Sequence, residues 1–453
     1  MSHVIAAVST GHQVAAIGIL RLSGDGAIAV ADRVFAAANG RPLSQSQDRK
    51  LVLGHLLDKH GRVLDEILAV VARGPHSYTG EDTVELQCHG SPAVLAAGLE
   101  ALFAAGARQA GPGEFTKRAF LNGCMDLTQA EAVIDLIEAE TADAAANAAG
   151  QLGGAISRQI RPIYDGLAGI CAHFHAVLDY PDEDIEDFQL ASFRGTLEHA
   201  LESLAALRST FDRGSLLKNG LDAVILGRPN VGKSSLLNAL AGYNRVIVTD
   251  VAGTTRDAVT EVLMLGGLKL RLTDTAGIRE TGDEIEAMGV EIAESAAARA
   301  SLALCVFDGS QPLFPEDQRV MEAASQAGHV IAVLNKTDLP AVLTPSDLPF
   351  DLVVPLCAKT GEGIALLEQA VEICFPAGLP CDGAILTNAR QAGAIDRAGA
   401  SLSAAMDSMA RRMTPDAVLV DVEDALEALG EITGQTMREE ITNQIFSRFC
   451  VGK

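Results

Sequence analysis

The chain has 453 residues, a formal net charge of −24 at pH 7, and 48% apolar against 21% charged residues. This length suggests two to four domains, and the composition is that of an ordinary folded protein. The charge excludes a generally basic surface, so a nucleic-acid partner would need a local basic patch or one supplied by another protein.

The cysteines and the apolar runs indicate the cellular compartment. There are eight cysteines without a Cys-x-x-Cys pair or a His spacing that completes a zinc site, which is typical of reduced, cytosolic chains. The N-terminus lacks a basic-then-apolar signal, and no run of about 18 apolar residues occurs. We expect a cytoplasmic protein without a membrane segment.

Residues 1–118 mix short apolar runs with Gly, Pro and polar turns. The runs at 15–22, 66–72 and 83–87 predict strands, and 91–105 predicts a helix. This mixture predicts a small N-terminal α+β domain.

Helical periodicity follows over residues 119–216 and returns over 380–453. One apolar stripe runs from Ile156 to Val177 with Pro162 as a potential kink, a second runs from Phe193 to Phe211, and Val422, Leu426, Leu429 and Ile432 share a face. Between them, residues 217–379 repeat a strand-loop-helix pattern, with strands beginning at Ala223, Leu268, Leu302, Val330 and Leu352. We expect a multidomain α+β and α/β protein in which a mostly parallel α/β domain is inserted into a helical domain.

A phosphate-binding loop opens the inserted domain. Gly227-Arg-Pro-Asn-Val-Gly-Lys-Ser234 follows a buried-type strand and precedes a helix. Its glycines allow backbone N–H groups to surround a phosphate, and the helix N-terminus adds a partial positive charge. Lys233 can reach the outer phosphates, and the Ser234 hydroxyl can bind Mg²⁺.

The remaining motifs of a guanine-nucleotide site follow in order. Gly253-Thr-Thr-Arg-Asp257 supplies a threonine for the Mg²⁺ shell, and Asp274-Thr-Ala-Gly277 places a carboxylate near the metal. The carboxylate of Asp338, in Asn335-Lys-Thr-Asp338, can accept two hydrogen bonds from guanine, and adenine lacks that donor pair. Cys357-Ala-Lys359 replaces the usual Ser-Ala-Lys, whose backbone contacts the base. These motifs predict a Ras-like GTPase domain.

The predicted GTP site comprises one long set of residues. They are Asn230, Val231, Gly232, Lys233, Ser234, Ser235, Thr249, Asp250, Val251, Ala252, Gly253, Thr254, Thr255, Asp274, Thr275, Ala276, Gly277, Asn335, Lys336, Thr337, Asp338, Cys357, Ala358 and Lys359.

The hydrolytic water cannot be oriented as it is in Ras-like switches. Those proteins carry a Gln after Asp-x-x-Gly, and here that position is Ile278, which cannot polarise water. Another acid or amide from 279–286 must serve. Arg256 and Arg279 lie near the motifs, but surface salt bridges are the more natural role for either.

The whole chain resembles the bacterial tRNA-modification GTPase family usually called MnmE or TrmE. The similarity extends beyond the GTPase motifs to Tyr78-Thr-Gly-Glu-Asp82, to Pro112-Gly-Glu-Phe-Thr116 and to the C-terminal Ile445-Phe-Ser-Arg-Phe-Cys-Val-Gly-Lys453. The resemblance implies an N-terminal folate-binding and dimerising domain, a helical domain and an inserted G domain. It also implies a homodimer that joins an FAD-dependent partner in a heterotetramer and installs a carboxymethylaminomethyl-type group on C5 of the wobble uridine of certain tRNAs.

The resemblance also assigns roles to single residues. It implies potassium ligands at Asn230, Thr249, Val251 and Thr254, Mg²⁺ binding by Thr255, and a catalytic acid at Glu286 that orients water. K⁺ would stabilise transition-state charge as an arginine finger does elsewhere, when two G domains meet. For 5-formyl-tetrahydrofolate or a related folate it implies Arg21, Glu85 and Lys453.

The chain departs from the family at one folate position. Cys124 stands where the family commonly has Lys, which puts the affinity for folate in question. Cys450 could act as a thiol near the folate, although a structural cysteine is equally compatible with the sequence.

Two other functions share these GTPase motifs. A ribosome-assembly GTPase would have nearly the same G domain but usually a basic RNA-binding module, and none is visible in the sequence. A purely structural dimer would not need Lys233, Ser234, Asp274 and Glu286 together. Both alternatives are therefore less well supported than tRNA modification.

Overall fold

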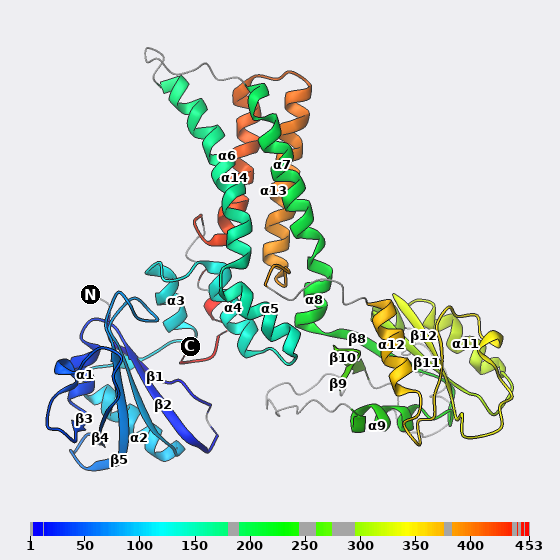
Figure 1. Cartoon of the computed structure of the whole chain (residues 1–453), viewed down its shortest axis with the longest axis horizontal. Helices are drawn as coiled ribbons and strands as arrows, with labels where there is room; N and C mark the ends of the chain where they lie inside the picture. Colours follow the sequence, from blue (N-terminus) through cyan, green and yellow to red (C-terminus); the bar gives the residue numbers. More distant parts are fainter. Residues whose placement is uncertain are drawn as a thin grey trace. The chain divides into compact units, whose positions relative to one another are not determined.

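The computed structural model describes residues 3–11, 13–179, 190–243, 260–273, 295–375, 383–436, 442, 445–447 and 449–452. The chain divides into two compact units (Figure 1). The first contains Met1–Ile137, Ala148–Ala205 and Arg390–Lys453, and the second contains Glu138–Asn147 and Ala206–Ala389. Among the described residues, no helix is both long and apolar enough to cross a membrane.

The first unit contains a seven-stranded sheet in the order β3-β4-β5-β6-β2-β1-β7. All neighbours are antiparallel except β1 and β7. The expected strands near 15–22, 66–72 and 83–87 are confirmed as β2, β5 and β6. The strands are β1 Ile5–Val8, β2 Ala15–Ser23, β3 Phe35–Ala37, β4 Val52–Leu57, β5 Val63–Ala72, β6 Thr83–Gly90 and β7 Arg108–Gln109.

One face of this sheet is covered by helices and the other exposes apolar side chains. α2, Pro92–Ala104, confirms the expected helix and lies so close that a Cβ on its Gly98 would meet Leu20 and Leu56 at 2.7 and 2.9 Å. α1, Ala27–Asp32, contributes to the same core. On the opposite face Leu53 and Leu68 are paired in register and are 49% and 37% exposed.

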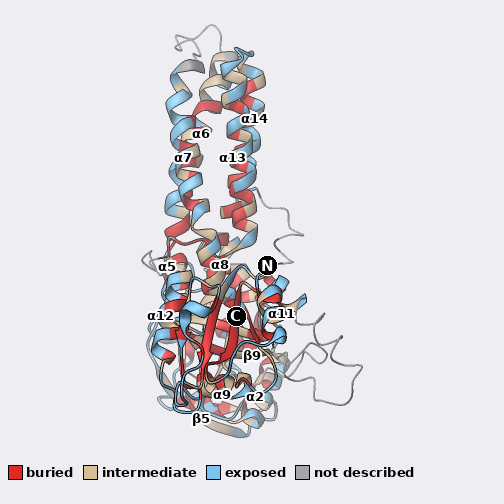
Figure 2. Ribbon diagram, turned by 90° about the vertical axis from the view of Figure 1, so that its right-hand side faces the viewer, coloured by how far each residue is buried: buried red, intermediate tan, exposed pale blue. Residues whose placement is uncertain are grey.

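Four long helices of the first unit run side by side (Figures 1 and 2). They are α6 Ala155–Asp179, α7 Arg194–Ser209, α13 Ala389–Ala410 and α14 Pro415–Thr433. α6 contacts α14, so chain segments from either side of the second unit pack together. Their buried residues include Ile156, Leu167, Val422 and Leu429 from the predicted stripes.

Two details of the helical pattern differ from a simple reading of the periodicity. α6 continues through Pro162. The stripe from Phe193 to Phe211 is divided, because α7 ends at Ser209 and α8 begins after Thr210.

The shorter helices are α3 Glu114–Leu121, α4 Leu127–Ile137, α5 Ala142–Leu152, α8 Phe211–Asn219, and the 3-10 turns Leu43–Gln45, Leu190–Phe193 and Pro345–Asp347.

The second unit contains a six-stranded sheet in the order β13-β12-β11-β8-β10-β9. It is parallel except for β9 and β10, as expected for a doubly wound sheet. Five strands were expected from the sequence, whereas β9 was not, because at this edge only alternate residues such as Leu263 and Leu265 are buried. The strands are β8 Leu221–Leu226, β9 Thr260–Leu265, β10 Leu268–Thr273, β11 Leu302–Asp308, β12 His329–Asn335 and β13 Val353–Pro355, with helices α9 Lys233–Tyr243, α11 Pro315–Ala324 and α12 Ile364–Cys374.

The parallel register brings the motif residues to one edge. β8, β11 and β12 are adjacent, and their carboxyl ends are Leu226, Asp308 and Asn335. In open α/β sheets, ligands bind outside the carboxyl ends of the strands. The phosphate loop therefore begins beside the residues that follow β11 and β12.

Candidate functional site

The loop between β8 and α9 has backbone geometry that favours glycine at its two ends. Gly227 has φ 156° and Gly232 has φ 105°. A Cβ at Gly227 would lie 2.6 Å from the Val306 carbonyl oxygen, and one at Gly232 would collide with the Asn335 amide. The loop thus follows a tight path against β11 and β12, as an anion-binding turn requires.

Lys233 directs its ammonium group into this loop. Its Nζ donates to the carbonyl oxygens of Gly227 and Arg228 at 2.7 and 2.9 Å. Burial lowers the pKa of Lys233. The two hydrogen bonds nevertheless hold the ammonium group within the turn where a phosphate would be bound. Ser234 and Ser235 follow in the first turn of α9 and are exposed.

Asn335 joins three parts of the predicted base site. Its Nδ2 donates to the Val231 carbonyl oxygen at 2.8 Å, and its Oδ1 accepts from the Ala358 N–H at 3.0 Å. The same side chain therefore fixes the phosphate loop and the segment Cys357–Lys359 against the end of β12. The Cys357 N–H donates to the Glu362 carbonyl, so the exchange of Ser for Cys leaves this backbone bond intact.

Lys336 makes a second link to the phosphate loop. Its Nζ donates to the Asn230 carbonyl oxygen at 3.0 Å and to Asp308 Oδ2 at 2.6 Å. Asp338 is exposed two residues later. The structure thus brings the phosphate loop, Asn335, Lys336 and Ala358 together. Asp308 was missed in the sequence because it belongs to none of the guanine-nucleotide motifs.

Arg228 attaches the loop to the segment before α11. Its Nη2 donates to Gln311 Oε1 at 2.8 Å, its guanidinium lies 4.6 Å from the Phe314 ring centroid, and Asp317 is 3.4 Å away. No motif pointed to these contacts. They depend on a fold that brings residues more than 80 positions apart into contact.

Part of the predicted site lies outside the described residues. This applies to Thr249, Asp250, Val251, Ala252, Gly253, Thr254, Thr255, Asp274, Thr275, Ala276, Gly277, Glu286 and Lys453. In the described part of the chain, no group of three or more His, Cys, Asp and Glu side chains forms a metal site. Of the predicted cation ligands, the structure therefore describes Ser234 and Asn230 alone.

The predicted folate residues Arg21 and Glu85 are direct neighbours. They are paired in register on β2 and β6, and Arg21 Nη2 lies 2.8 Å from Glu85 Oε1. The guanidinium lies 5.8 Å from the ring centroids of both Tyr78 and Phe115. This arrangement places a cation, a carboxylate and the partly exposed Tyr78 ring on the face of the sheet that α2 does not cover, whereas the Phe115 ring is fully buried.

The Tyr78 side chain contacts helix α3. Its hydroxyl is 2.9 Å from Thr116 Oγ1, and burial raises its pKa. The following loop passes Cys124, because a Cβ on Gly80 would lie 2.9 Å from its sulfur. Cys124, which replaces the family Lys, is thus exposed beside the loop that carries Tyr78.

The C-terminal segment reaches this domain. Val451 bridges to Pro112, and the Gly113 N–H donates to the Cys450 carbonyl at 3.3 Å. Ser9 Oγ donates to the Gly452 carbonyl at 2.9 Å. The residues before Lys453 are therefore anchored next to the end of β1 and the start of α3, whereas Cys450 has an exposed, free side chain.

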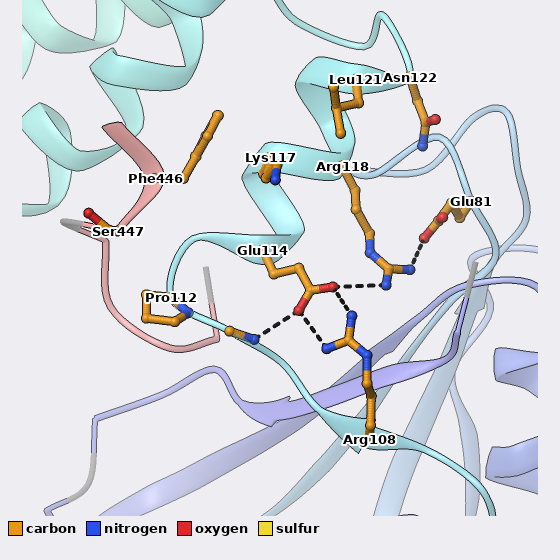
Figure 3. Close-up of a pocket in the computed structure, with 11 residues that line it drawn as sticks. Glu81, Arg108, Pro112, Glu114, Lys117, Arg118, Leu121, Asn122, Phe446 and Ser447 are labelled. Atoms are coloured by element: carbon orange, nitrogen blue, oxygen red, sulfur yellow. Dashed lines mark hydrogen bonds and ion pairs between the residues drawn. The ribbon is translucent and has the colours of Figure 1, made fainter. Parts of the chain in front are cut away.

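A cavity of about 580 Å³ is lined by α3 and by the C-terminal residues Phe446 and Ser447 (Figure 3). Its charged walls are largely neutralised, because Glu114 accepts from Arg108, Arg118 and the Gly111 N–H, and Arg118 also binds Glu81. The lining residues are Glu81, Arg108, Gly111, Pro112, Glu114, Lys117, Arg118, Leu121, Asn122, Phe446 and Ser447.

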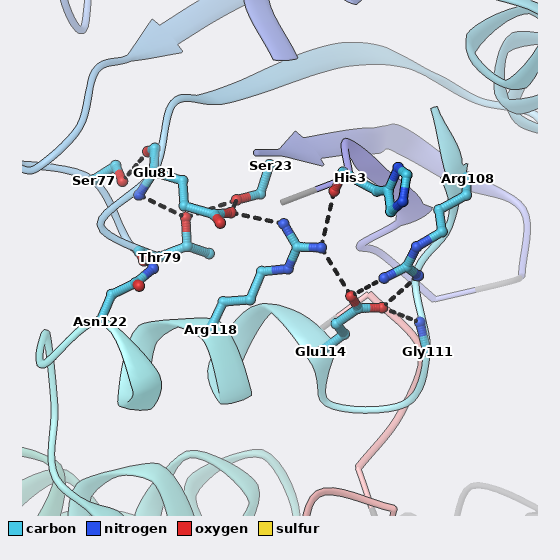
Figure 4. A network of polar contacts seen from close by, with 10 residues as sticks. All are labelled: His3, Ser23, Ser77, Thr79, Glu81, Arg108, Gly111, Glu114, Arg118 and Asn122. Carbon is cyan, nitrogen blue, oxygen red and sulfur yellow. Dashed lines mark hydrogen bonds and ion pairs between the residues drawn. The ribbon is translucent and has the colours of Figure 1, made fainter. Parts of the chain in front are cut away.

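The same ion pairs extend to the loop that carries Tyr78 (Figure 4). Glu81 Oε2 accepts from Ser23 Oγ at 2.8 Å, and Asn122 Nδ2 donates to the Thr79 carbonyl at 2.6 Å. We interpret these hydrogen bonds and ion pairs as a scaffold. They attach the loop between β5 and β6 to Ser23 at the end of β2 on one side and to Arg118 and Asn122 of the α3 region on the other.

Two family models match the chain, one on each side of residue 125. Residues 4–124 match a family model described as the GTP-binding protein TrmE N-terminus, and residues 127–450 match one described as the MnmE helical domain. The chain is 43% identical over 459 residues to a tRNA modification GTPase MnmE of Chloroflexus aurantiacus, covering 100% of both chains. It is 44% identical to another of Symbiobacterium thermophilum, covering 99% of both.

A solved structure resembles a smaller part of the chain. It is Aquifex aeolicus Era bound to GDP and aluminium fluoride, 27% identical over 40% of this chain and 66% of that chain. The TM-score is 0.27, which is too low to support a conclusion.

Proposed function

The chain belongs to the MnmE family of tRNA modification GTPases, and from this premise we propose that it works with an FAD-dependent partner to install a carboxymethylaminomethyl-type group on C5 of the wobble uridine of certain tRNAs. It is a GTP hydrolase that acts in tRNA modification. The wobble-uridine position, the partner and a cytoplasmic location are our proposals. The full-length similarity supports them, because it includes the domains on both sides of the G domain.

The base end of the nucleotide site carries the GTP assignment. Asn335 binds the phosphate loop and the Ala358 backbone at the same time, so the pieces that would contact guanine and phosphate are held together. In this site Asp338 would accept hydrogen bonds from guanine, and Lys233 would bind the outer phosphates. The described loop geometry is compatible with a nucleotide, since Gly227 and Gly232 have positive φ values that allow backbone N–H groups to turn toward a phosphate.

We propose that hydrolysis depends on cations and on a second G domain. Mg²⁺ would be held by Ser234 and Thr255, and K⁺ by Asn230, Thr249, Val251 and Thr254; K⁺ supplies positive charge to the transition state. Glu286 would orient the water, since Ile278 cannot. Asn230 supports this role through its position inside the loop, with a left-handed φ of 64° that directs its backbone away from the helical path.

A potassium titration tests this part. Hydrolysis by the full chain should be faster in KCl than in NaCl at equal ionic strength, and equal rates would contradict the K⁺ assignment. Nucleotide affinity in the two salts provides a readout independent of turnover.

We propose that the uncovered face of the N-terminal sheet holds a folate and a second copy of the chain. Arg21, Glu85 and Lys453 would contact the folate, with the partly exposed Tyr78 beside its rings. The carboxylate and guanidinium suit the donors and acceptors of a pterin, and aromatic rings favour stacking. Ile17, Leu53 and Leu68 on this face leave apolar surface to cover, as a homodimer interface requires.

Nucleoside mass analysis of tRNA tests the function directly. Cells that lack the protein should lose the modified wobble uridine, and the wild-type chain should restore it. Normal wobble uridine with defective ribosome assembly would instead support the alternative class of assembly GTPase, which no described contact favours.

A further inference from the structure

A carboxylate outside the nucleotide-binding motifs lies at the centre of the base end of the G domain. Asp308 is the last residue of β11 and is paired in register with Asn335 at the end of β12. Its side chain is only 2% exposed. Burying a charge is costly unless donors surround it, so its partners indicate what it does.

The two carboxylate oxygens have separate partners. Oδ1 accepts from the Ser310 N–H at 3.0 Å and from Ser310 Oγ at 2.6 Å, which closes a local turn. Oδ2 accepts from Lys336 Nζ at 2.6 Å. Burial raises the pKa of Asp308, but the hydrogen bonds from Lys336 and Ser310 outweigh burial and lower it. The group is therefore a carboxylate that attracts the Lys336 ammonium.

Lys336 continues this contact to the phosphate loop. The same Nζ donates to the Asn230 carbonyl at 3.0 Å. Lys336 and Asn230 both have left-handed backbones, with φ 68° and 64°. This conformation is common for Asn but uncommon for Lys, so at Lys336 it indicates that neighbouring contacts hold the residue. A chain of polar contacts thus runs from Asp308 through Lys336 to Asn230.

We propose that Asp308 is a positioning residue for guanine-nucleotide binding. Its carboxylate fixes the Lys336 side chain across the base end of the pocket, so that the loop after β12 and the phosphate loop keep their spacing without nucleotide. Asp308 contacts no nucleotide itself. The inference rests on the proposed nucleotide site and adds a residue that the GTPase motifs do not contain.

A double-mutant cycle on the full chain tests the inference. Asp308→Asn keeps the size of the side chain and an acceptor for Ser310 but removes the charge. In the wild-type background this change should lower the affinity for a fluorescent GDP analogue about tenfold. In the Lys336→Ala background the same change should lower the affinity less than twofold further. Equal losses in both backgrounds, or no loss in the first, would overturn the proposal.

Three further variants separate positioning from folding. Asp222→Asn removes a carboxylate that pairs with Arg271 at the opposite end of the same sheet, and should leave affinity unchanged. Ser310→Ala should also be neutral, and a loss like that of Asp308→Asn would show that the turn, not Lys336, matters. Asp308→Glu keeps the charge and should bind within about threefold of wild type. If Asp308→Asn does not fold, Asp308→Ser, which also removes the charge, takes its place in the cycle. A wild-type chain that fails to bind GDP would instead overturn the nucleotide site itself, and this proposal with it.

Discussion

Glu114 in the N-terminal domain and Asp308 in the nucleotide site are carboxylates that accept several hydrogen bonds, but their partners differ. Glu114 accepts from Arg108, Arg118 and the Gly111 N–H, and all three partners belong to the framework around α3. Asp308 accepts from Lys336, which continues to the phosphate loop. The contacts of Glu114 stabilise the N-terminal domain, whereas the contact of Asp308 with Lys336 helps to position the phosphate loop. Similar chemistry thus serves stability in one region and ligand binding in the other.

The largest expected effect is the loss of GTP hydrolysis when Glu286 is replaced, without an effect on the N-terminal domain. Glu286→Ala should retain GTP binding and lose roughly 100- to 1,000-fold in hydrolysis rate, because the water loses its orienting base. Single-turnover hydrolysis and nucleotide titration measure the two quantities. Wild-type turnover would contradict the role of Glu286, and folate affinity should remain unchanged as the control.

A second change reverses base selectivity. Asp338→Asn should weaken GTP binding roughly 50-fold through loss of charged hydrogen bonds and should favour xanthine nucleotides, whose 2-oxo group can accept from the amide. Competition between GTP and XTP for the variant measures this. Unchanged selectivity would mean that another residue reads the base.

A substitution in the N-terminal scaffold should lower the free energy of unfolding and leave nucleotide affinity unchanged. Burial raises the pKa of Glu114, but hydrogen bonds from Arg108, Gly111 and Arg118 lower it to about 2, from an ordinary value of 4.5. Its contribution is therefore complete above pH 4.5 and is lost as the pH falls toward 2. Glu114→Gln should cost about 2 kcal/mol at pH 7.

Chemical denaturation between pH 7 and pH 3 checks that prediction. The difference between wild type and Glu114→Gln should shrink as the pH falls below 4.5. A constant difference, or weaker GDP binding by the variant, would contradict a purely structural role for Glu114.

The smallest expected effect concerns the proposed folate site. Arg21→Ala should lower the affinity for 5-formyl-tetrahydrofolate about tenfold, because Glu85 loses its ion-pair partner and the Tyr78 ring loses the guanidinium beside it. Calorimetric titration measures the change, and GDP binding should not move. Cys124→Lys, which restores the common family residue, should raise folate affinity if that position contributes to the site.

Sequence reasoning recovers local structure well in this chain. The phosphate loop lies between β8 and α9 as expected, and the expected strands at Ala223, Leu268 and Leu302 are confirmed. The family, the Ras-like domain and GTP hydrolysis in tRNA modification are confirmed as well. The edge strand β9 and the break at Thr210 were missed, because an edge strand buries few side chains and one apolar stripe can continue over two helices.

Consecutive residues determined the nucleotide chemistry by themselves, since a glycine turn, a lysine and a helix start need only neighbours in the chain. Tertiary structure alone decided which distant groups support that chemistry. Asp308 meets Lys336 because β11 and β12 are adjacent in register, and Arg118 meets Glu81 because α3 lies beside the loop that precedes β6. Such pairs depend on strand register and helix packing, which no local pattern specifies.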